Sequence, residues 1–331
     1  MATFIHSILQ PNVAVAADGQ IAYDLPVNPL TALIIHLTPL NNTATITDYQ
    51  HLAGLFSAID TINITFQGNS IVNISGADML ALLISYWGIV PSLANATDDN
   101  NERRSIAFPV PLGRRLYDPD ECFPATKRGE LQALLTWDIA DTGFDALAIS
   151  LETIELPDAN PPHVTKYTTL NQTFAATGDN DVDLPIGNLL RGVLCFGTTG
   201  FTGAAPAPTL GQLQLLINNR NSHYTSTDFS TSRLIRSLGG RNKQVEYDHL
   251  HALNAAGAGQ EDTREPMSDA QADENYTFLD LDPTRDDLYS IDTAGAGRIN
   301  LRIDADAANA ARFVPVERVL VSDLLTSPGG V

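Results

Sequence analysis

The amino-acid sequence predicts an all-β protein made of two tandem β-sandwiches, each with one short inserted helix. Three observations lead to this fold class. The 331 residues are about twice the length of a typical domain. The apolar residues fall in short runs bounded by turn residues, as strands do. A set of strand and helix signals also occurs twice in the same order, which indicates a duplicated module.

The repeat begins with a short motif followed by an apolar strand. Asp24-Leu25-Pro26-Val27 precedes the run from Leu30 to Leu37, and Asp183-Leu184-Pro185-Ile186 precedes the run from Leu189 to Phe196. The corresponding motif and run recur in the same order in both halves of the chain. Runs of this length bounded by Pro, Gly and Asn are typical of buried strands.

An alternating strand and a polar turn come next in each half. Ile62 to Phe66 and Leu213 to Ile217 alternate with a period of two, which places one face of each strand in a core. The turns that follow are Gly68-Asn69-Ser70 and Arg220-Asn221-Ser222.

A helix start follows both turns. Ser75-x-x-Asp78 and Thr225-x-x-Asp228 each place a hydroxyl three residues before a carboxylate, which is the pattern of a capping box. The apolar residues expected on these helices are Met79, Leu80, Leu82, Leu83 and Tyr86 in the first and Phe229, Leu234, Ile235 and Leu238 in the second.

The remaining strands also correspond, and they complete a module of seven or eight strands that fits a β-sandwich. The matched pairs are Ile106–Val110 with Tyr276–Asp280, Leu131–Asp138 with Ile299–Asp304, and Leu151–Ile154 with Val316–Val319.

The domain division follows from these matches. We expect an N-terminal arm at residues 1–17, a first module at 18–157 and a second at 158–331. The boundary lies in Pro157–Pro162, a rigid polar stretch after the last strand of the first module. Residues Gly239–Asn275 lack periodicity and are expected to form an extended surface loop.

Composition and charge exclude several classes of protein. The net charge is −20, which argues against a surface that binds nucleic acid. The N-terminus has no signal-peptide pattern, so folding in a cytoplasm is expected. The longest apolar run, Met79 to Val90, is too short to span a bilayer. Cys122 and Cys195 have no ligand-like spacing and are expected to be free thiols.

Two segments have weak metal-binding patterns. Asp248-His249-Leu250-His251 has alternate histidines, but cupin enzymes follow such a pair with a glutamate where this chain has Ala255 and Ala256. Asp179-x-Asp181-x-Asp183 opens like a calcium loop, yet Leu184 replaces the required glycine and Leu190 replaces the closing glutamate. A solvated loop and a polar turn entering a strand are the preferred interpretations.

A third acidic cluster, with Asp280, Asp282, Asp286 and Asp287, is likewise interpreted as a polar turn. The sequence contains no phosphate-binding loop, dinucleotide fingerprint or nucleophile elbow. We therefore predict no catalytic residues, no metal ligands and no cofactor, and the protein is not expected to be an enzyme.

The duplicated architecture supports a resemblance to a known family. Tandem jelly rolls with a helix in each resemble the major capsid proteins of the tectivirus, corticovirus and adenovirus lineage of tailless icosahedral viruses. The segment from Phe108 to Pro119 also resembles a strand and loop in coat proteins of small lipid-containing phages. The likeness covers nearly the whole chain.

The resemblance implies a structural protein of the virion. Three copies would form a homotrimer whose six jelly rolls make a pseudo-hexagonal capsomer. Its implied partners are neighbouring capsomers, penton or minor capsid proteins and, in many relatives, a membrane beneath the shell. Asn95–Arg104 and Gly239–Asn275 are candidate tower or interface loops, and Met1–Ala17 is a candidate contact segment because Phe4, Ile5 and Ile8 have little local structure to bury them.

Two alternative functions belong to other classes. A two-domain jelly-roll enzyme, such as a bicupin or an amidase-like hydrolase, would need a bound metal or convergent acids in a cleft. A carbohydrate-binding adhesin or spike would share the fold and bind a glycan without assembling into capsomers.

Overall fold

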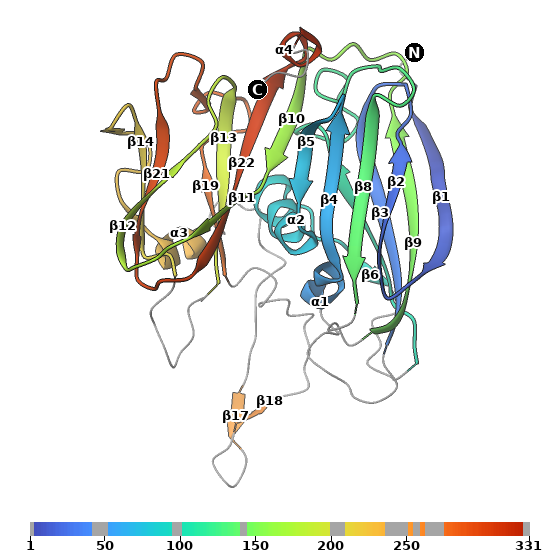
Figure 1. Cartoon of the computed structure of the whole chain (residues 1–331), viewed down its shortest axis with the longest axis horizontal. Coiled ribbons are helices and arrows are strands. Elements are labelled where there is room, and N and C mark those ends of the chain that lie inside the picture. Colours follow the sequence, from blue (N-terminus) through green and yellow to red (C-terminus); the bar gives the residue numbers. More distant parts are fainter. Residues whose placement is uncertain are drawn as a thin grey trace.

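The structure is a computed structural model that describes residues 3–41, 52–94, 101–139, 144–198, 209–235, 251–253, 259–261 and 275–326. Figure 1 shows two β-sandwiches side by side, the first in blue and green and the second in yellow-green to red. The expected all-β class with two jelly rolls and short helices is confirmed.

The first jelly roll consists of two facing sheets. One has the order β1-β9-β3-β7-β6, and the other contains β2-β8-β4-β5. Alternation along the strands places Leu33 and Ile35 of β3 opposite Ile62 and Ile64 of β4 in one buried core. The bounds are β1 (Ile5–Val15), β2 (Asp18–Asp24), β3 (Leu30–Asn41), β4 (Ile59–Phe66), β5 (Asn69–Ile74), β6 (Leu93–Ala94), β7 (Ser105–Pro111), β8 (Leu131–Asp138) and β9 (Phe144–Glu155).

The second jelly roll repeats this arrangement. Its sheets have the orders β10-β22-β13-β19 and β12-β21-β14-β15, and its core contains Val193 and Cys195 of β13. The bounds are β10 (His163–Thr168), β11 (Leu170–Thr173), β12 (Gly178–Asp183), β13 (Leu189–Gly197), β14 (Gln212–Ile217), β15 (Arg220–Asn221), β16 (Thr227–Asp228), β19 (Tyr276–Asp280), β20 (Ile291–Asp292), β21 (Ile299–Ala305) and β22 (Ala310–Leu320).

The two jelly rolls share structural details that packing of an apolar core does not require. A buried glutamate at the end of β9 and of β22 accepts a hydrogen bond from an asparagine beside the opposing strand: Asn28 to Glu155 at 2.8 Å, and Asn188 to Glu317 at 2.7 Å. The β4–β5 and β14–β15 turns both use two residues with positive φ, Gln67-Gly68 and Asn218-Asn219. The structure therefore supports a duplication independently of the sequence pattern.

This correspondence corrects part of the sequence alignment. Aligning Leu151–Ile154 with Val316–Val319 would make Leu320 the residue that corresponds to Glu155. In the structure the residue that corresponds to Glu155 is Glu317. Each strand pair has an irregularity near its start, at Thr31 in β3 and at Arg191 in β13, and this shared feature fixes the alignment. Short apolar strands resemble one another in several registers, so the sequence pattern alone did not determine the match.

The first expected helix is confirmed, with one difference. Helix α2 (Gly76–Leu82) begins after Ser75, whose hydroxyl accepts a hydrogen bond from the Asp78 amide at 3.2 Å. A π-helical turn, Leu83–Trp87, continues it. The Asp78 carboxylate does not return to the helix start as a capping box requires, because it binds Arg312 instead.

The start expected for the second helix was wrong. Helix α3 (Phe229–Ile235) begins after Asp228, whose carboxylate accepts a hydrogen bond from the Thr231 amide at 2.9 Å. Thr225 cannot cap it because Thr227 and Asp228 pair with β14 as β16. Two further short helices were not expected, α1 (Leu52–Ser57) and α4 (Val321–Thr326).

The N-terminal segment is not a loose arm within the described residues. Strand β1 pairs with β9 from Ile5↔Glu155 to Val15↔Leu147 and forms the edge of its sheet. Its apolar side chains remain exposed, with Phe4 60%, Ile5 40% and Ile8 67% exposed. The lack of local structure expected here was wrong, whereas the exposure of these side chains is as anticipated.

The expected tower loops lie mostly outside the described residues. Only Asn101–Arg104 of the first loop is described, and in Gly239–Asn275 the described parts are β17 (His251–Leu253), β18 (Gly259–Glu261) and Asn275. The side chains of Leu234 and Ile235, and Leu238 as a whole, are also outside the described part. The Pro157–Pro162 stretch connects β9 to β10.

Gly192 gives a test of the packing between β13 and β19. A Cβ atom at this position would lie 2.3 Å from Cζ of Phe278 and 2.9 Å from the carbonyl oxygen of Leu279. We expect Gly192→Ala to lower the free energy of unfolding by about 1–3 kcal/mol through overpacking, measured by thermal and chemical denaturation. Gly295→Ala is the control, because nothing lies within 4 Å of its Cβ position; equal stability of the two variants would contradict the packing.

Candidate functional site

The junction between the two jelly rolls contains the largest cluster of interacting charged side chains that the structure describes. Strand β10 pairs in parallel with β5, at Tyr167↔Val72 and Thr168↔Asn73, and this short contact merges a sheet from each jelly roll into one. Beside it, the Trp87 and Tyr167 rings lie 5.5 Å apart in an edge contact. The junction therefore combines strand pairing, ring packing and the ion pairs described next.

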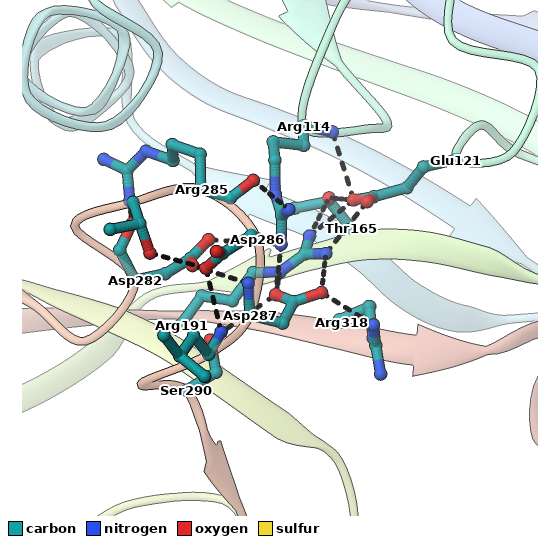
Figure 2. A network of polar contacts seen from close by, with 12 residues as sticks. Arg114, Glu121, Thr165, Arg191, Asp282, Arg285, Asp286, Asp287, Ser290 and Arg318 are labelled. Atoms are coloured by element: carbon teal, nitrogen blue, oxygen red, sulfur yellow. Dashed lines mark hydrogen bonds and ion pairs between the residues drawn. The ribbon is translucent and has the colours of Figure 1, made fainter.

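Arg191 lies at the centre of an ionic network (Figure 2). Its guanidinium donates to both oxygens of Glu121, at 2.5 and 2.9 Å, and to both oxygens of Asp287, at 2.8 and 3.2 Å. Glu121 comes from the β7–β8 connection of the first jelly roll, and Asp287 from the β19–β20 connection of the second. One buried guanidinium thus makes two bidentate pairs that join the two halves of the chain.

Two further arginines form ion pairs with Asp287. Arg318 of β22 donates to it at 2.6 Å, and Arg114 of the first jelly roll also contacts it directly. The Asp287 amide donates to Asp282 at 2.8 Å, which fixes the loop while Asp287 keeps a positive φ of 64°. Three guanidiniums therefore converge on one carboxylate from three different segments.

The segment that carries Arg114 and Glu121 is held by a close backbone contact. A Cβ atom on Gly113 would lie 1.9 Å from the carbonyl oxygen of Glu121, so only glycine permits this approach. The Gly113 carbonyl accepts a hydrogen bond from the Trp87 indole at 3.0 Å, and Thr165 donates to Glu121 at 2.5 Å. Glu121 is thus positioned by both jelly rolls before it meets Arg191.

The charges of the network balance. Burial opposes ionisation of Glu121 and Asp287, but the Arg191 guanidinium outweighs it and holds the pKa of both carboxyls below the usual range. Burial raises the pKa of Asp282. Burial also raises the pKa of Tyr86 to about 12, so its hydroxyl stays protonated. Such an arrangement has the chemistry of a fixed structural contact, because its ionised groups already have partners.

A second ion pair crosses the junction at α2. Asp78, on the first jelly roll, accepts from Arg312 of β22 at 2.7 Å and from the Tyr276 hydroxyl at 2.7 Å. The Arg312 guanidinium also lies over the Phe196 ring, 3.7 Å from its centroid. Nearby, Arg285 of the second jelly roll lies over the Tyr86 ring at 4.3 Å and donates to the Tyr86 carbonyl at 3.1 Å.

The structure revises the interpretation of the acidic clusters. Asp282 and Asp287 lie in the β19–β20 connection and belong to the ionic network, a role that the interpretation as a polar turn did not include. Asp179, Asp181 and Asp183 lie on β12 itself, where Asp181 pairs with Arg302 at 2.8 Å and Asp183 with Arg298 at 2.6 Å. They form a polar outer face of a strand instead of a turn that enters one.

The other sequence candidates do not form a site in the described structure. Asp248-His249-Leu250 lies outside the described residues, and the side chain of His251 is likewise not described. Cys122 and Cys195 are both buried and free. Among the described residues, no group of three or more His, Cys, Asp or Glu side chains is arranged to hold a metal ion, and no helix has the length and apolar character needed to cross a membrane.

The network residues were missed because the sequence analysis searched for catalytic patterns. One signal was present: Arg191 interrupts the apolar run from Leu189 to Phe196. A charged residue inside a buried strand requires a partner of opposite charge. The partners Glu121 and Asp287 have no local signature, since they are 70 and 96 residues away in the sequence.

Replacing Arg191 tests the network. Arg191→Met would leave the Glu121 and Asp287 carboxylates buried without their main partner, and we expect a loss of about 3–5 kcal/mol in the free energy of unfolding. Arg302→Met is the control, because the Arg302–Asp181 pair lies on an exposed strand face and its loss should change stability little. Similar denaturation midpoints for the two variants would show that the buried network stabilises the fold no more than the exposed Arg302–Asp181 pair does.

The pKa shifts predict a dependence of stability on pH. The folded pKa of Glu121 and Asp287 is lowered, so their contribution is fully present above their ordinary values of 4.5 and 3.8 and is lost as the pH falls through the folded values. We expect Glu121→Gln to flatten the loss of stability below about pH 4, measured by urea denaturation across pH 2–7.

Glu317→Gln is the matched variant, because the pKa of Glu317 is shifted in the opposite direction to the pKa of Glu121. Burial raises the pKa of Glu317, so the fold is most stable while this carboxyl is protonated and loses that stability as the pH rises through the folded pKa. We expect the Gln variant to be at least as stable as the wild type at pH 7. A clear loss of stability at pH 7 would contradict this assignment.

Comparison with known proteins gives matches in structure alone. The sequence matches no protein-family model, and no curated protein is similar to it. The atomic structure of Sulfolobus turreted icosahedral virus aligns over 98% of this chain and 94% of its own, with 13% identity and a TM-score of 0.65. The major capsid protein P2 of bacteriophage PM2 aligns over 99% of this chain and 100% of its own, with 11% identity and a TM-score of 0.61.

A third match has the same character. A chain of the PBCV-1 virus capsid aligns over 96% of this chain and 94% of its own, with 8% identity and a TM-score of 0.59. Both jelly rolls take part in each alignment, since nearly the whole chain is covered. The chain thus has the double jelly-roll fold found in major capsid proteins of icosahedral viruses.

Proposed function

We propose that the protein is a major capsid protein, which assembles with copies of itself into the shell of an icosahedral virion. The observation that carries the proposal is the whole-chain match to double jelly-roll capsid proteins, in which both jelly rolls and the connection between them align. No part of the described chain is left over as a separate functional domain.

The junction supports the same role. A capsid subunit with two jelly rolls must hold them at a fixed angle, because each jelly roll occupies its own place in the lattice. The Arg191 network and the Asp78–Arg312 pair supply such a fixed contact through buried, paired charges.

The finer features of the proposal extend this role. The modules are residues 18–157 and 158–331, preceded by the segment 1–17. Three chains form a homotrimeric, pseudo-hexagonal capsomer that contacts neighbouring capsomers and, at special positions, penton or minor capsid proteins. The chain folds in the host cytoplasm and is incorporated into the virion, where a membrane beneath the shell is a further partner.

Light scattering coupled to size-exclusion chromatography tests the proposal. A trimer has a mass of 3 × 35.6 = 106.8 kDa, and we expect this species at micromolar concentration. Electron microscopy of the same sample should show flat, pseudo-hexagonal particles. A protein that stays at the monomer mass at all concentrations, or one that carries stoichiometric iron or manganese, would contradict the capsid role.

A further inference from the structure

We draw no further inference here: the strongest candidate, the group of exposed apolar side chains at the end of the two jelly rolls where β3 and β13 begin, which includes Val27 and Ile186 in the matching β2–β3 and β12–β13 connections, carries no proposal because nothing in the described structure shows what covers it.

Discussion

The buried Arg191 guanidinium is the constraint on which the arrangement of the two jelly rolls depends. It pairs with a carboxylate from each jelly roll, and the burial of Arg191 and Glu121 makes separation of the halves costly. Asp287 then gathers Arg114 and Arg318 at the same point, so that segments from both halves of the chain are fixed together. The β5–β10 pairing and the edge contact between the Trp87 and Tyr167 rings also belong to the junction. The two sandwiches thus form one body whose internal angle is fixed by charge pairing.

The two modules keep the same strand order, the same bulge and the same buried Asn–Glu pair. They differ at the positions that form the junction: Arg191 and Arg312 of the second jelly roll correspond to Thr31 and Ser150 of the first. A contact made during folding of one chain can contain buried charges because its partners are always present.

The sequence predicted features that depend on neighbouring residues. Period-two alternation located β4 and β14, and Ser75 marked the start of α2, because strands and caps are decided by side chains a few positions apart. Features that depend on distant partners were missed or misplaced. Asp287 was interpreted only as part of a polar turn, because its partner Arg114 is 173 residues away in the sequence. The N-terminal strand β1 was taken for an arm because its apolar residues find a sheet only through β9.

Differential scanning calorimetry of the full-length protein tests the central claim most directly, namely that the junction makes the two jelly rolls one cooperative unit. The account predicts a single unfolding transition whose calorimetric enthalpy equals the van't Hoff enthalpy. It also predicts that the transition splits or broadens when Arg191 is replaced. Two well-separated transitions in the wild-type protein, unchanged by that replacement, would show that the jelly rolls unfold independently and would contradict the account.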